Sequence, residues 1–114
     1  MTAQLDESVP VRLAKALAAV GCRVLRFPNE WKGLKNGDLL ARVRSAGCSC
    51  LVTCDKNIQY QQTISLSGLA LVILPCQRFE DIAPLAGAIA MAVEQAQPGE
   101  IVAISINGKL SKVK

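Results

Sequence analysis

The chain has 114 residues, of which 51% are hydrophobic and 19% are charged. This length supports one domain with a real hydrophobic core, and the composition excludes an intrinsically disordered protein. The net charge of +4 does not indicate a strong nonspecific nucleic-acid binder. Three lysines lie in the last six residues, and without them ten basic residues face nine acidic ones. We therefore expect a single domain over residues 1–106 and a basic C-terminal tail over residues 107–114.

Missing residue types exclude several chemistries. The chain has no histidine, which removes Ser–His and Cys–His catalysis and histidine acid–base chemistry. Its five cysteines lack zinc-ribbon spacing, and residues 50, 52 and 54 alternate along one strand face, so we expect free thiols that act as small core hydrophobes. The longest apolar run, residues 69–74, is far too short to cross a bilayer, and the N-terminus is polar. We expect no membrane association and a cytoplasmic location.

Strands and helices alternate along the chain, which predicts parallel βαβ units and the α/β class. The first strand covers residues 3–6. Ser8 is expected to cap a helix that enters through Pro10 and runs to Val20, where Gly21 stops it. A second strand, a polar segment and a second helix then follow over residues 22–27, 28–35 and 36–47.

The second half of the chain repeats this alternation. Two buried strands cover residues 49–54 and 69–74, with a short helix or turn over residues 55–63 between them. A long helix from residue 80 or 81 to Gln95 is apolar almost all round, which is typical of a deeply buried helix or of one shared with a partner. The fifth strand covers residues 100–106, and the remaining residues form either a frayed end or an edge hairpin.

Three acidic residues mark the carboxyl edge of this arrangement. Right-handed crossovers predict a mainly parallel five-stranded sheet of order 2-1-3-4-5, with its topological switch point between strands one and three. Those strands end at Asp6 and Asp55, and Asp38 opens the second helix. Convergent carboxylates repel one another and are tolerated mainly around a hard divalent cation. The pattern therefore predicts a site for Mg²⁺ or Mn²⁺ at Asp6, Asp38 and Asp55.

Each candidate residue also has a purely structural interpretation. Asp6 and Asp55 are typical of turns and caps, and Asp38 suits the first turn of a helix, where Arg42 lies four residues on. Lys56 is suited to neutralising a phosphate, or it is simply solvated. A polar cluster suited to contacting a substrate follows at Asn57, Tyr60, Gln61 and Gln62.

Three segments occur in a characteristic order: LDESVP at residues 5–10, WKGLKNGDLL at 31–40 and LVTCDKNIQYQQ at 51–62. They resemble the motifs LDENxP, GWxGLKNGELL and VTVDKNLxYQQN of the PIN-like domain family, which is found in predicted toxins of bacterial toxin–antitoxin pairs. The sequence departs from these motifs where it has Ser8 for Asn, Glu30 for Gly, Asp38 for the more usual Glu, and Thr63 for Asn.

The resemblance implies a three-layer α/β/α PIN-like fold and a Mg²⁺- or Mn²⁺-dependent endoribonuclease that acts on an RNA substrate. It implies that Asp6, Asp38 and Asp55 are the catalytic, metal-binding acids. It also implies the toxin role in a toxin–antitoxin pair, with a small antitoxin protein as partner. The residues expected to bind the substrate are Lys56, Asn57, Tyr60, Gln61 and Gln62.

Two other functions stay open. A catalytically weak or inactive PIN-like interaction module would pair through the helix at residues 82–93, with a second copy as a homodimer or with an antitoxin-like protein. A receiver-like phospho-acceptor domain also carries acids after its first strand and an Asp after its third. Against the receiver interpretation, no lysine lies at the end of the fifth strand, where residues 105–108 come before Lys109.

Overall fold

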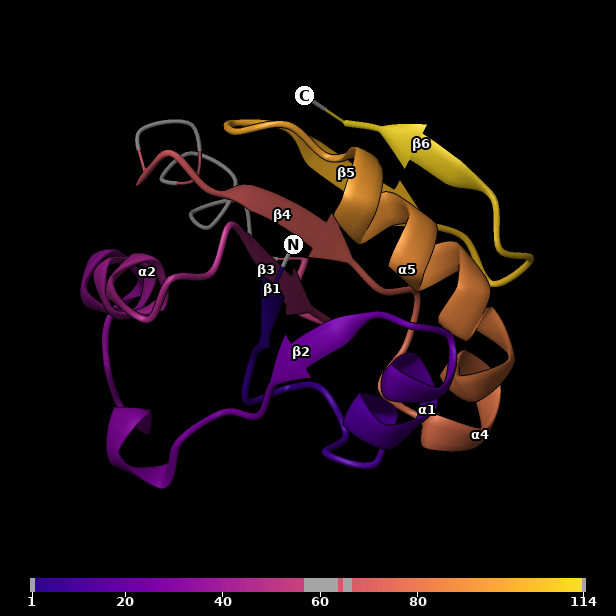
Figure 1. Ribbon diagram of the computed structural model, residues 1–114, viewed down its shortest axis with the longest axis horizontal. Helices are drawn as coiled ribbons and strands as arrows, with labels where there is room; N and C mark the ends of the chain where they lie inside the picture. Colours follow the sequence, from indigo (N-terminus) through magenta and orange to yellow (C-terminus); the bar gives the residue numbers. More distant parts are fainter. Residues whose placement is uncertain (1, 57–63, 65–66, 114) are drawn as a thin grey trace.

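The computed structural model describes residues 2–56, 64 and 67–113. One sheet of six strands, in the order β2-β1-β3-β4-β5-β6, runs through the molecule (Figure 1). The strands are β1 (Thr2–Leu5), β2 (Arg23–Leu25), β3 (Cys50–Thr53), β4 (Ala70–Ile73), β5 (Ile101–Ile104) and β6 (Leu110–Lys112). The first five pair in parallel, and β6 pairs antiparallel with β5. The α/β class, the mainly parallel sheet and the order of its first five strands are confirmed, but the predicted count of five strands is wrong.

The additional strand, β6, lies in the C-terminal segment, for which the sequence allowed either a frayed end or an edge hairpin. A tight turn joins it to β5: the Gly108 N–H donates to the Ser105 carbonyl over 2.9 Å, and Gly108 has φ +82°. Lys112 Nζ in this strand lies 2.6 Å from Oε2 of Glu100, the residue directly before β5. The strand is short and largely exposed, so it carries little hydrophobic alternation from which the sequence could have predicted it.

Helical segments cover both faces of the sheet, with α2 on one face and α1, α4 and α5 on the other (Figure 1). They are α1 (Leu13–Ala19), the 3₁₀ turn η1 (Asn29–Trp31), α2 (Asn36–Ser45), α4 (Phe79–Ile82), the 3₁₀ turn η2 (Ala83–Leu85) and α5 (Ala86–Gln95). Within the part of the chain that the structure describes, no helix combines the length and the apolar character needed to cross a bilayer.

Two of these helical segments differ from their predictions. The first helix begins at Leu13, five residues beyond Ser8, and no side chain caps it. The Ser8 hydroxyl is bonded to the Asp6 carboxylate instead. The long helix expected up to Gln95 is divided into α4, η2 and α5. Pro84 lies in η2, and because proline has no N–H the α-helical bonding pattern cannot run through it.

Alternating side chains divide the core into two clusters. Leu5, Cys50 and Val52 pack in the cluster that also contains residues of α1 and α5. Leu51 and Leu71, from the intervening strand positions, pack in the cluster that contains residues of α2. All five cysteines are free thiols, as predicted. Strands β3 and β4 are buried along their whole length, which agrees with their continuous apolar runs.

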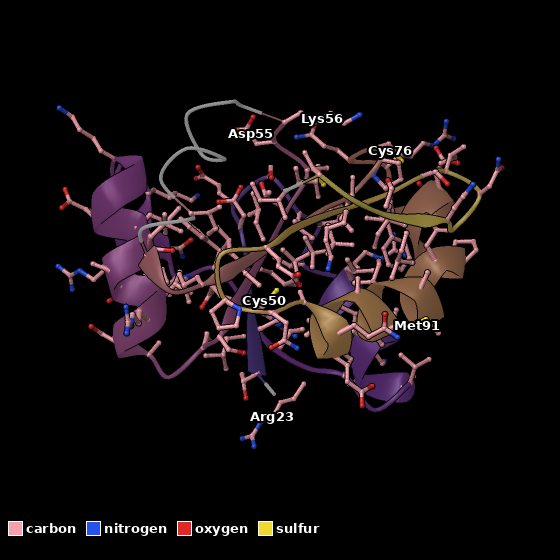
Figure 2. The ribbon with its side chains drawn as sticks, turned by 90° about the horizontal axis from the view of Figure 1, so that it is seen from above. Arg23, Cys50, Asp55, Lys56, Cys76 and Met91 are labelled. Carbon is pink, nitrogen blue, oxygen red and sulfur yellow. The ribbon has the colours of Figure 1, made fainter. Side chains whose placement is uncertain are left out.

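Internal packing accounts for most of the apolar character of residues 82–93. Ile82, Ile89 and Val93 are buried in the cluster shared with α1, whereas Met91 is 51% exposed. Figure 2 shows Met91 on the outer part of α5. The homodimer through this segment stays a prediction. The face of the helix that packs within its own chain is not available to a partner.

We expect substitutions at two glycines to have opposite effects on the free energy of unfolding. Gly21 has φ +81° directly after α1, so Gly21→Ala forces a left-handed backbone and should cost about 1–2 kcal/mol. Gly87 lies within α5 with no atom within 4 Å of an added Cβ, so Gly87→Ala should stabilise by about 0.5–1 kcal/mol. Urea unfolding monitored by circular dichroism measures both, and a shift of the same sign in the two variants would contradict the prediction.

Candidate functional site

The carboxyl ends of β1 and β3 meet at one edge of the sheet. Asp6 directly follows β1, its N–H donates to the Val52 carbonyl over 2.9 Å, and Leu5 lies opposite Val52 in the register. Asp55 lies two residues beyond β3. Figure 2 shows Asp55 at this edge and Arg23, the first residue of β2, at the opposite end of the molecule. The two aspartates therefore flank the point where the strand order reverses.

A cavity of about 620 Å³, which we call the acidic cavity, opens at this edge. Asp6, Glu7, Asp55 and Lys56 supply its charged groups. Four apolar side chains also line it, from the segment after β2 and from α2: Phe27, Trp31, Leu34 and Leu39. Ser8, Gly33, Cys54 and Gln77 complete the lining. The Phe27 and Trp31 rings meet edge to face with centroids 6.1 Å apart. Carboxylates thus share a cavity with flat aromatic surfaces.

Asp6 is held by hydroxyl groups from both strands. Its side chain is 7% exposed, and its Oδ2 atom accepts hydrogen bonds from Ser8 Oγ over 2.8 Å and from Thr53 Oγ1 over 2.9 Å. The two hydroxyl oxygens lie 3.2 Å apart. Charge-assisted bonds of this kind are among the stronger ones in proteins, so they fix the orientation of the carboxylate in the cavity.

The same hydroxyls also bind the backbone that carries Asp55. The Asp55 N–H donates to Thr53 Oγ1 and the Cys54 N–H donates to Ser8 Oγ, each over 3.0 Å. Each hydroxyl therefore accepts one backbone proton and donates its own to Asp6. This relay of hydrogen bonds connects the turn after β1 to the end of β3 and sets the positions of the two aspartates together.

The other predicted site residues have different placements. Lys56 is exposed, lines the acidic cavity and lies at the same edge as Asp55 (Figure 2). Asp38 is exposed in the first turn of α2 and does not line the cavity, although its neighbour Leu39 does. The remaining predicted substrate contacts lie outside the described residues: Asn57, Tyr60, Gln61 and Gln62.

The donor set of the cavity fits a magnesium-like ion better than a soft metal. Among residues 2–56, 64 and 67–113, no three Asp, Glu, Cys or His side chains are close enough together to hold a metal ion. Mg²⁺ does not need three, because it usually keeps several waters and binds through one or two carboxylates together with substrate phosphates. Asp6 and Asp55 supply two hard oxygen donors that line one cavity, which meets this requirement.

Cys54 lines the acidic cavity but is unsuited to act as a nucleophile. Burial, the neighbouring Cys76 thiol and the Asp6 carboxylate raise its pKa to about 11. Its Sγ lies 3.1 Å from the Cys76 carbonyl oxygen, to which the thiol donates. Since the thiolate is the nucleophilic form, the protonated Cys54 thiol is inert near neutral pH. The chemistry of the cavity therefore depends on its oxygen donors.

No family model matches the chain, and neither the curated proteins nor the solved structures include a significant match.

Sequence reasoning identified Asp6 and Asp55 but missed the residues that orient them. Thr53, the last residue of β3, lies two positions before Asp55, and Ser8 lies two positions after Asp6. Both spacings are typical of side chains that bond a nearby carboxylate or backbone group, and this signal was available in the sequence. Gln77 lies beyond the end of β4, the strand next to β3, at the same carboxyl edge.

We expect Thr53 and Asp6 to be energetically coupled. Thr53 is fully buried, so Thr53→Val leaves Asp6 Oδ2 short of a donor and the Asp55 N–H short of an acceptor, at a cost of about 1–3 kcal/mol. Thr53→Ser keeps the hydroxyl and should recover most of the loss. Urea unfolding of Thr53→Val, Asp6→Ala and the double variant measures the coupling, which should be about 0.5–3 kcal/mol. Strictly additive effects would show that the hydroxyl–carboxylate bond contributes nothing.

Proposed function

We propose that the chain is a metal-dependent endoribonuclease with the three-layer α/β/α arrangement of a PIN-like domain, and that it is the toxin of a toxin–antitoxin pair. One observation carries the proposal: Asp6 and Asp55, from neighbouring parallel strands at the topological switch point, line the same cavity. The three motif resemblances over residues 5–62 support the choice of RNA as substrate. The toxin role, with a small antitoxin as partner, rests on that resemblance alone.

Asp6 and Asp55 would hold one Mg²⁺ or Mn²⁺ ion. When bound, such an ion lowers the pKa of a coordinated water for in-line attack on a phosphodiester and stabilises the charge that develops on the phosphate oxygens. Ser8 and Thr53 keep the Asp6 carboxylate in one orientation, so no free energy is needed to order it when the substrate arrives.

The remaining residues have positioning roles in this proposal. Lys56, exposed beside Asp55, contacts a phosphate of the RNA backbone. Phe27 and Trp31 present aromatic surfaces on which a base adjacent to the reacting phosphodiester stacks. Asp38 does not line the cavity, although its neighbour Leu39 does, so in this proposal Asp38 acts on the metal through a water molecule. The polar cluster that begins at Asn57 contributes further substrate contacts.

The first test is cleavage of a single-stranded RNA in the presence of Mn²⁺. Asp6→Asn and Asp55→Asn should each reduce the rate more than about 100-fold, beyond the 10- to 100-fold range that is typical of water-mediated partners and that we expect for Asp38→Asn. Asp6→Asn is a conservative change because its amide oxygen can still accept the Ser8 and Thr53 bonds.

The matched control is Asp81→Asn, which removes the same charge from an exposed position of α4 that does not line the acidic cavity. It should cleave at the wild-type rate. Wild-type cleavage by both Asp6→Asn and Asp55→Asn would reject the assignment of the two acids.

The inactive interaction module remains the second candidate, and one observation favours it: the bonds to Asp6 Oδ2 give this carboxylate a structural role even without a metal. The two functions differ in thermal stability. If the acids hold Mn²⁺, a concentration 100 times the dissociation constant should stabilise the fold by about 2.7 kcal/mol. We expect Mn²⁺ to raise the Tm of the wild type and of Asp81→Asn, and to leave that of Asp55→Asn unchanged. An equal Tm with and without Mn²⁺ in the wild type would favour the interaction module.

No specific observation favours the receiver-like alternative. β5 ends at Ile104 and is followed by Ser105 and Ile106, so the lysine expected at the end of the fifth strand is not at that position. Covalent labelling of Asp55 by a small phosphodonor such as acetyl phosphate would nevertheless support it.

A further inference from the structure

Two more cavities continue from the acidic cavity around the β2 side of the molecule. A small one of about 180 Å³ shares Asp6, Glu7 and Phe27 with the acidic cavity. It shares Val11 and Arg26 with a third cavity of about 540 Å³ that lies against α1. The three cavities therefore adjoin one another in a row that starts at the carboxylates and ends at α1, and we call this row the depression.

The charge changes sign along this depression. Asp6, Glu7 and Asp55 lie at its acidic end. Four exposed cations line the other two cavities: Lys32 in the small one, Arg26 in both, and Arg12 and Lys15 in the third. We call the surface that these four side chains form the basic trough. Among the described residues that line the third cavity, none is acidic.

Apolar surface accompanies these cations. Val11 is 58% exposed in the third cavity, and the Arg12 guanidinium lies 4.2 Å from the centre of the Phe79 ring in the same cavity. The nearest acid to that pair along the chain is Glu80, whose Oε2 lies 3.5 Å from Arg78. The basic trough thus combines positive charge with flat apolar surface on its own lining.

We propose that the basic trough binds the backbone of single-stranded RNA as it leaves the acidic cavity, which rests on the proposed nuclease function. RNA alternates phosphates with flat bases, and positively charged grooves that carry aromatic surfaces are the usual platform for such strands. A polymer cleaved beside Asp6 and Asp55 must extend beyond the reacting phosphodiester, and the cavities that carry the basic trough adjoin that point. Phosphates contact Lys32, Arg26 and Lys15 in turn, and bases lie against Phe27 and Phe79.

The test is the salt dependence of RNA binding. The probe is a short, fluorescein-labelled single-stranded RNA, and fluorescence anisotropy in EDTA measures its Kd without cleavage. In the triple variant Lys15→Gln, Arg26→Gln and Lys32→Gln, the slope of log Kd against log salt should fall by about two, since each single-strand phosphate contact contributes about 0.7. Affinity at low salt should fall about tenfold or more.

The matched control removes the same charge elsewhere, with Arg23→Gln at the opposite end of the sheet, Arg42→Gln on α2 and Lys109→Gln in the β5–β6 turn. It should keep the wild-type slope, and circular dichroism should show both triple variants folded. Equal slopes in the two variants would overturn the proposal, and so would binding of an acidic peptide in place of the RNA. RNA bound along the basic trough but never cleaved would leave this inference standing and reject only the nuclease function.

Discussion

The hydrogen bonds to Asp6 Oδ2 are the interaction on which this edge of the molecule depends. A nearly buried carboxylate is costly unless it is hydrogen-bonded, and here Ser8 and the fully buried Thr53 provide the donors. The two hydroxyls come from different strand ends, so the bonds hold β1 and β3 together beyond the last pair of the sheet. The same two hydroxyls accept hydrogen bonds from the Cys54 and Asp55 N–H groups and so position the backbone of Asp55.

A second buried polar side chain extends this order to the edge strand. Gln4 is 1% exposed, and its Nε2 donates to the carbonyls of Leu25 over 3.2 Å and Arg26 over 3.0 Å. These bonds fix the direction in which the chain leaves β2. The direction in turn places Phe27 in the acidic cavity and Arg26 at the start of the basic trough. Gln4 in β1 and Asp6 directly after it thus position residues of both the acidic cavity and the basic trough.

What the sequence predicts and what it misses follow from the range of the interactions. The buried runs at β3 and β4 have a strong local pattern, and right-handed crossovers then give the order of five strands, which brings Asp6 and Asp55 together. The bond from Ser8 to Asp6 spans two residues and follows a local pattern, whereas the bond from Thr53 to Asp6 spans 47 residues and no local rule contains it. The sixth strand is short and exposed, so its place is set by pairing with β5 and not by its own periodicity. The interruption of the helix at Pro84 follows from a local property of proline and could have been predicted from the sequence. The position of Asp38 depends on where α2 packs, which the sequence does not give.

Net charge is a poor guide to where a nucleic acid would bind, for a physical reason. The composition adds all charges together, whereas screening confines each one to about 10 Å at ordinary ionic strength, so binding depends on local groups. The fold separates acids at the switch point from cations along the β2 side, and a nearly neutral body then offers both signs on one continuous surface. A phosphate chain on that surface is attracted at one end and repelled at the other unless a cation lies among the carboxylates. In the proposed nuclease, metal and RNA would therefore each strengthen the binding of the other, and tight engagement of the acidic cavity would be confined to the state competent for cleavage.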